Sequence, residues 1–151
     1  MSKYTGSCLC GSILYEVNGE IRDLLNCHCS DCRKSHGAAF RTRGAVDANT
    51  FRFVCGEDLL NRYEHKSGEY RSFCSRCGSN IATFYANPSS PIGLAIGTLD
   101  SPLSKKPRFH VFVSDKASWY TITDDLPQFP QFPPRSKEAE QVGDGDAEEA
   151  V

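Results

Sequence analysis

Three short cysteine clusters constrain this chain more than any other feature. Cysteines one and two residues apart are too close to bridge one another without strain, which disfavours a disulfide framework. The start, Met1 to Gly6, has no apolar signal region, and this favours a reducing compartment such as the cytoplasm. The clusters therefore predict metal sites. They hold seven of the eight cysteines and read Cys8-Leu9-Cys10-Gly11, Cys27-His28-Cys29-Ser30-Asp31-Cys32 and Cys74-Ser75-Arg76-Cys77-Gly78.

The first and third clusters share a glycine directly after a cysteine, at Gly11 and Gly78. Glycine tolerates positive φ, so the backbone can fold around the sulfur atom and direct its N–H groups towards it. Four thiolates around one zinc form a closed, structural site. Such a site would join distant segments and stabilise the fold strongly. We expect its ligands to be Cys8, Cys10, Cys74 and Cys77.

The second cluster lacks that glycine and supplies three cysteines, Cys27, Cys29 and Cys32. Zinc with three protein ligands keeps a fourth position for water or substrate, which is typical of a catalytic site. A thiol in that position is held as its thiolate. Cys32 falls in the first turn of an expected helix, whose N-terminus favours the thiolate. We therefore expect a second, catalytic zinc here.

Other residues leave alternatives open at the second site. Cys55 could close it as a fourth ligand and make it structural, although a buried cysteine in a strand pattern commonly just packs. His28 lies between two ligands, so we expect it to face away from the metal that they share. His36, His65 and His110 are interpreted as hydrogen-bonded structural residues rather than ligands.

The remaining sequence predicts a mainly β fold with one or two short helical turns. Ser30-Asp31 and Gly37 bracket a helical turn of about six residues. Lys66-Ser67-Gly68 predicts a hairpin turn. The expected strands are 12–17, 39–46, 50–54, 59–65, 69–73, 81–85, 92–96 and 108–113, with 21–26 leading into the second cluster.

Composition divides the chain into a zinc-binding domain (1–126), a Pro-rich extension (127–135) and an acidic tail (136–151). The extension can lie along the domain through its two Phe side chains, and the tail is expected to be disordered. Residues 1–135 carry 16 basic and 13 acidic side chains, whereas the tail carries one and six. Neither excess indicates a nucleic-acid partner, and no stretch is long enough to span a bilayer.

These motifs resemble the family of glutathione-dependent formaldehyde-activating enzymes, which also includes centromere protein V. The resemblance covers about residues 5–126, including Gly97-Thr98-Leu99-Asp100 and 110–120 with Trp119-Tyr120. It implies a β-tent fold related to zinc ribbons. It also implies a structural zinc on Cys8, Cys10, Cys74 and Cys77, and a catalytic zinc on Cys27, Cys29 and Cys32.

The activity that the resemblance implies is that of a carbon–sulfur lyase. Glutathione, or a similar thiol, adds to formaldehyde or another small aldehyde to give S-hydroxymethylglutathione, with the sulfur held by zinc as a nucleophile. The carboxylates of glutathione would need cations. The candidates are Arg33, Lys34, Arg41, Arg43, Arg71 and Arg76.

Two other functions remain open from the sequence. A non-enzymatic zinc module could bind a protein partner through a sheet edge or the Pro-rich segment. Closure of the second site by Cys55 would favour this function. Alternatively, Cys27, Cys29 and Cys32 could release zinc on oxidation and make the chain a redox-responsive protein.

Overall fold

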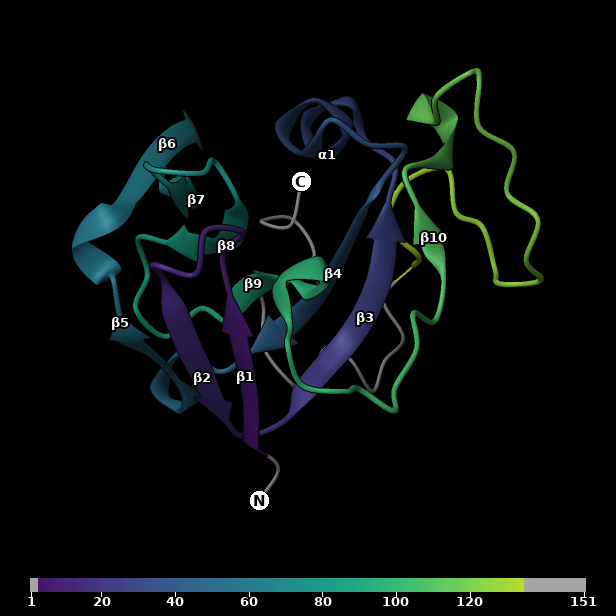
Figure 1. Cartoon of the computed structure of the whole chain (residues 1–151). Coiled ribbons are helices and arrows are strands. Elements are labelled where there is room, and N and C mark those ends of the chain that lie inside the picture. Colours follow the sequence, from purple (N-terminus) through teal and green to yellow (C-terminus); the bar gives the residue numbers. More distant parts are fainter. Residues whose placement is uncertain (1–2, 135–151) are drawn as a thin grey trace.

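Two β-sheets and one short α-helix make up residues 3–134, the part of the chain that the computed structural model describes (Figure 1). The larger sheet has the strand order β10-β3-β4-β9-β8-β7-β6, and the smaller has the order β1-β2-β5. Every neighbouring pair is antiparallel except β10 and β3. The prediction of a mainly β fold is therefore confirmed. The strands are β1 (Lys3–Ser7), β2 (Leu14–Asn18), β3 (Ile21–Cys27), β4 (Arg41–Val46), β5 (Phe51–Cys55), β6 (Leu60–Lys66), β7 (Glu69–Cys74), β8 (Asn80–Tyr85), β9 (Ile92–Ala95) and β10 (His110–Val111).

The hydrophobic core lies between the two sheets. Because successive side chains of a strand point to opposite faces, Ile21, Val46 and Leu94 share one face of the larger sheet. They pack with Tyr15 and Val17 of β2, and none of the five side chains is more than 1% exposed. The opposite face of the larger sheet is shared by a second, smaller hydrophobic cluster and by buried polar side chains.

Helix α1 (Ser30–His36) follows β3 directly and carries the last cysteine of the second cluster. Its N-cap is Cys29, whose sulfur accepts a hydrogen bond from the Cys32 amide at 3.3 Å. The sequence placed this cap one residue later, at Ser30-Asp31, because a cysteine is an uncommon cap. The predicted stop at Gly37 is confirmed, since this residue adopts a left-handed conformation (φ 58°) and its N–H bonds to the Arg33 carbonyl.

The Pro-rich segment lies against the end of the larger sheet as far as the structure describes it. Phe129 packs edge-on to Phe109, and Phe132 packs in the same way on Phe112, with ring centroids 5.6 and 5.0 Å apart. The His110 amide also donates to the Pro127 carbonyl at 2.9 Å. The acidic tail predicted for 136–151 lies outside the described residues.

The described residues also include four single-turn 3-10 helices: Ala48–Thr50, Glu57–Leu59, Ile96–Thr98 and Val113–Asp115. Within residues 3–134, no helix combines the length and the apolar character that a membrane crossing requires.

Candidate metal centres

The structure brings the first and third cysteine clusters together. The loop after β1 carries Cys8 and Cys10, while Cys74 ends β7 and Cys77 lies in the turn that follows. All four Sγ atoms lie within 4.8 Å of one another. The Cys8–Cys10 and Cys10–Cys74 sulfur atoms are 3.6 and 4.0 Å apart. These separations exceed a disulfide bond and match the roughly 3.8 Å expected between thiolates on a tetrahedral zinc with Zn–S bonds near 2.3 Å.

The surroundings of this four-cysteine centre favour the thiolate at two of its members, whereas burial raises the pKa of Cys74. The Ile13 amide donates to Cys8 Sγ at 3.3 Å. Hydrogen bonds from the hydroxyl and the backbone of Ser79 lower the pKa of Cys77 to about 5. Ser12 lowers the pKa of Cys10 in the same way. Since zinc binds the deprotonated thiol, this donor set fits a thiophilic divalent metal.

The structure also gathers the second cluster into one three-cysteine centre. Cys27 ends β3, Cys29 caps α1 and Cys32 lies in its first turn. Their Sγ atoms lie within 4.8 Å of one another, and the three side chains are at most 3% exposed. Among the described residues, no fourth Cys, His, Asp or Glu joins this group. Three sulfur ligands are therefore all that residues 3–134 offer a metal here.

Cys55 does not close this centre. It lies at the end of β5, in the smaller sheet, where its thiol faces the Ser12 carbonyl at 3.7 Å. The strand expected around Cys55 is present, but the side chain is exposed rather than buried. The reason is that β5 is an edge strand of its three-stranded sheet.

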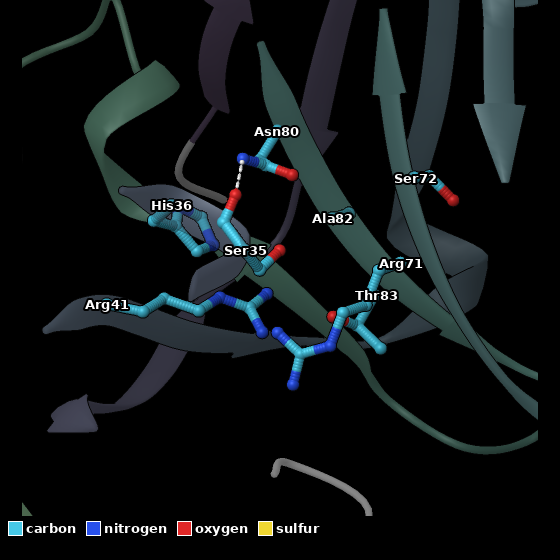
Figure 2. Close-up of a pocket in the computed structure, with 8 residues that line it drawn as sticks. All are labelled: Ser35, His36, Arg41, Arg71, Ser72, Asn80, Ala82 and Thr83. Carbon is cyan, nitrogen blue, oxygen red and sulfur yellow. Dashed lines mark hydrogen bonds between the residues drawn. The ribbon is translucent and has the colours of Figure 1, made fainter. Parts of the chain in front are cut away.

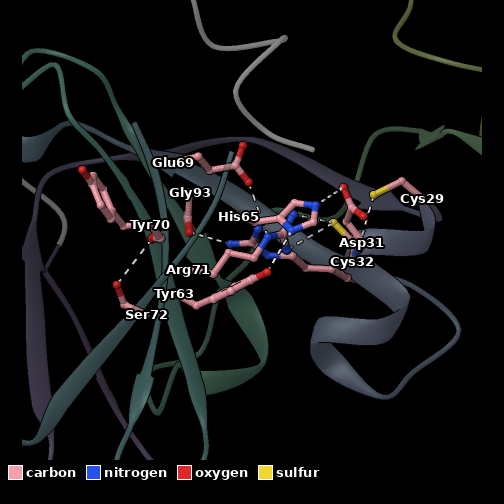
Figure 3. A network of polar contacts seen from close by, with 11 residues as sticks. Cys29, Asp31, Cys32, Tyr63, His65, Glu69, Tyr70, Arg71, Ser72 and Gly93 are labelled. Atoms are coloured by element: carbon pink, nitrogen blue, oxygen red, sulfur yellow. Dashed lines mark hydrogen bonds and ion pairs between the residues drawn. The ribbon is translucent and has the colours of Figure 1, made fainter. Parts of the chain in front are cut away.

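Arginine lies directly beside the three-cysteine centre (Figure 3). Both terminal nitrogens of Arg71 donate to Cys32 Sγ at 3.9 Å, and its Nε lies 3.4 Å from Glu69 Oε1. Hydrogen bonds from Cys27 and Cys29, together with the charges of Arg41 and Arg71, lower the pKa of Cys32 far below that of a free thiol. The positive field thus stabilises the thiolate of Cys32, whereas hydrogen bonds with Cys29 and Cys32, together with burial, raise the pKa of Cys27.

A buried pair of histidines supports the three-cysteine loop from the other side. His28 Nε2 lies 2.8 Å from His110 Nδ1, and His110 Nε2 lies 3.0 Å from an oxygen of Asp124. Since a carboxylate only accepts, His110 donates through Nε2, and in the neutral imidazole Nδ1 then accepts from His28 Nε2. Burial, together with the nearby His110, lowers the pKa of His28 to about 4. His28 is therefore a buried, neutral imidazole that lies outside the candidate ligand group.

The other two histidines lie at hollows near the centre. His65 Nε2 lies 3.2 Å from Asp31 Oδ2, at the rim of a hollow of about 260 Å³ that Lys34, Tyr63 and Arg71 also line. His36 lines a small cavity below the end of α1. Neither belongs to a candidate ligand group within residues 3–134.

The sequence did not indicate two of these features. Asp124 and the contact between His28 and His110 depend on β10 lying parallel to β3, which no local pattern encodes. The choice of Arg71 from six basic candidates depends on the pairing of β7 with β8. The only signal available was the alternation of 108–113, which placed a strand around His110.

The fold and the two centres define a mainly β protein with one four-thiol and one three-thiol candidate metal site. The family model described as "Glutathione-dependent formaldehyde-activating enzyme" matches residues 3–115. The chain therefore belongs to this family, as the motifs indicated.

Two individual proteins agree with this assignment at different levels. A Halomonas elongata protein named "Putative glutathione-dependent formaldehyde-activating enzyme" is 30% identical over 125 residues, which cover 78% of this chain and 79% of that protein. A crystal structure of a Rhodobacter sphaeroides protein superposes with a TM-score of 0.54 at 23% identity. The superposition covers 66% of this chain and 91% of the Rhodobacter sphaeroides chain. At this level of identity, the likeness supports the fold assignment alone.

Proposed function

We propose that this protein catalyses the addition of glutathione, or a similar thiol, to formaldehyde, together with the reverse cleavage, as a zinc-dependent carbon–sulfur lyase. The observation that carries this proposal is the three-cysteine centre. Its three sulfur atoms converge, all are buried, and the described residues add no fourth ligand. Family membership supports the choice of thiol and aldehyde.

The two centres would hold zinc in different roles. Cys8, Cys10, Cys74 and Cys77 would form the closed, structural site, and Cys27, Cys29 and Cys32 the catalytic one. When bound at the three-cysteine centre, zinc would supply a Lewis acid that keeps a thiol deprotonated at neutral pH. A reducing compartment such as the cytoplasm would keep all seven thiols available.

The reaction needs little further chemistry from the protein. A lone pair on the glutathione sulfur forms the S–C bond while the C=O π pair moves to oxygen. That oxygen then takes up the proton which the thiol has lost, so atoms and charge balance. The protein binds and orients the thiol, and the guanidinium of Arg71 beside Cys32 stabilises negative charge next to the reacting sulfur.

The alternative of a closed, non-enzymatic zinc module loses its sequence argument. Closure of the second centre by Cys55 would have favoured it, and Cys55 lies in the other sheet. The chain does not supply that closure within residues 3–134.

The test is the rate at which the zinc-loaded protein forms and cleaves S-hydroxymethylglutathione, measured by NMR exchange spectroscopy with glutathione and formaldehyde. We expect clear acceleration over the spontaneous reaction. Cys29→Ser, which removes a ligand of the catalytic site, should lower it by about 100-fold or more. Cys55→Ser is the matched control, because it removes a cysteine outside both centres. A wild-type rate equal to the spontaneous rate, or equal loss in both variants, would refute the proposal.

A further inference from the structure

Three arginines are buried on the face of the seven-stranded sheet that is turned away from the hydrophobic core. Arg41 and Arg43 lie on β4 and Arg71 on β7, with exposures of 3%, 3% and 5%. Arg41 donates to the Gly93 carbonyl at 2.7 Å. A Cβ atom at Gly93 would lie 3.1 Å from Arg43 Nε and 3.5 Å from an Arg41 nitrogen, so the glycine keeps space for both side chains. Together these side chains form a strip of positive charge across the sheet, from β4 to β7.

Buried charges are normally paired, because removing a lone charge from water costs several kcal/mol. Arg71 contacts Glu69 and Cys32. Arg41 and Arg43, by contrast, form no ion pair with a carboxylate of residues 3–134, and the Nε atom of each is buried without a hydrogen-bond partner. Three thiolates around one divalent ion leave one negative charge, which offsets one of these two guanidinium groups. One positive charge remains, and it calls for an anion.

The space between two of the arginines can hold one oxygen atom of such an anion. Arg41 and Arg71 direct their guanidinium groups towards each other across a cavity of about 10 Å³, below Ser35 and His36 (Figure 2). That volume accepts about one water molecule or one oxygen atom. Burial and the charge of Arg41 lower the pKa of His36 to about 4, so this imidazole adds no competing charge at neutral pH.

Both arginines also reach hollows at the surface. Arg71 lines the hollow of about 260 Å³ between α1 and β6, and Arg41 lines another of about 550 Å³ next to Phe40 and Thr98. A ligand entering from either side can therefore place a charged end on these groups. Guanidinium is well suited to this because its planar fork binds both oxygens of a carboxylate.

We propose that Arg41 and Arg71 form a carboxylate-binding site beside the three-cysteine centre, which holds a carboxylate of the thiol substrate. This inference rests on the proposed function. The contact between Arg71 and Cys32 fixes the spacing, since it places the site within one side chain of the sulfur that the reaction uses. The site thus selects thiols that carry a carboxylate on the same molecule over neutral thiols.

The test separates binding from chemistry by using S-methylglutathione, which has both carboxylates of glutathione but no free thiol, and its diethyl ester. Calorimetric titration of the full, zinc-loaded chain should show affinity for the acid and at least about tenfold weaker binding of the ester. Arg41→Lys keeps the positive charge but loses the planar, two-pronged donor group. It should lower the affinity for the acid by about tenfold and leave the affinity for the ester unchanged. Arg71→Lys provides a second variant if Arg41→Lys does not fold.

The matched control is Arg62→Met, which removes an exposed arginine from β6 of the same sheet. It should leave both affinities unchanged. Equal binding of acid and ester, no binding of either, or an unchanged acid affinity in both lysine variants would overturn the inference. If S-methylglutathione binds as expected but the protein does not accelerate the reaction of glutathione with formaldehyde, the proposed function fails and the site stands. If glutathione and 2-mercaptoethanol react equally fast in wild type, the function stands and the site fails.

Discussion

His36 shows how a single residue reports the electrostatics of the site. Its pKa is lowered to about 4 by burial and by Arg41, whereas in the unfolded chain it stays near 6.5. Between these two values the unfolded state binds more protons than the folded state. Stability therefore falls as the pH drops from about 6.5 to 4, and it is unaffected by this group above 6.5.

Replacement of this imidazole should flatten the pH dependence. In His36→Gln, the loss of unfolding free energy between pH 7 and pH 5.5 should be smaller than in wild type by up to about 1 kcal/mol. Denaturant titrations at the two pH values measure this difference, with metal content checked at each. His28, which is shifted in the same direction, stays in both proteins and cancels. An identical pH dependence in both proteins would show that Arg41 and burial do not depress the pKa of His36.

The pairing of β1 with β2 depends on a close approach that only glycine permits. Gly6 pairs with Tyr15, and a Cβ atom at Gly6 would lie 2.1 Å from the Tyr15 ring. The ring cannot move easily, because it is buried, stacks on Phe51 and hydrogen-bonds to Thr98 at 2.7 Å. We therefore expect Gly6→Ala to lower the free energy of unfolding by about 1–3 kcal/mol.

The comparison for this change is Gly97→Ala, since a Cβ atom there meets nothing within 4 Å. Chemical denaturation of both variants under equal zinc loading gives the two values. Should Gly6→Ala prove as stable as Gly97→Ala, the contact between Gly6 and the Tyr15 ring does not constrain the β1–β2 pair.

Local patterns were sufficient for elements whose residues carry their own signals. The hairpin of β6 and β7 around Lys66-Ser67-Gly68, and the helix that ends at Gly37, lie where the turn residues predicted them. Strand β1 was missed because Gly6 and Ser7 have no apolar alternation and gain their place only from the partner strand. Strand β10 is shorter than the predicted 108–113, since Phe112 adopts a positive φ of 56° and ends the extended backbone.

The candidate site likewise combines residues that local patterns predicted with residues that they could not predict. Cysteine spacing and the glycine after each pair were enough to group the four-cysteine and three-cysteine sets that the structure brings together. The partners of those sets could not be found from spacing. Arg71 reaches Cys32 from a strand 39 residues away, and Asp124 reaches His28 only through His110. Such contacts depend on the order of strands in the sheet, which is a property of the whole fold.

At the scale of the whole molecule, the two centres should contribute very differently to stability. The four-cysteine centre joins the loop after β1 to the end of β7, so it ties the smaller sheet to the larger one. The three-cysteine centre joins only β3 to the adjoining α1. Since a metal link between distant segments restricts the unfolded chain much more than a local link, loss of the first should be far more costly.

Two matched substitutions test this difference. Cys74→Ser should unfold the protein or lower its melting temperature by about 10 °C or more, whereas Cys29→Ser should leave the fold largely intact while lowering the metal content from two ions to one. Thermal unfolding and elemental analysis of both variants, with Cys55→Ser as the control, provide the comparison. An unchanged melting temperature in Cys74→Ser would contradict the structural role of the four-cysteine centre. Unfolding of Cys29→Ser would instead show that the three-cysteine centre builds the fold, and would remove the physical basis for an open, catalytic site.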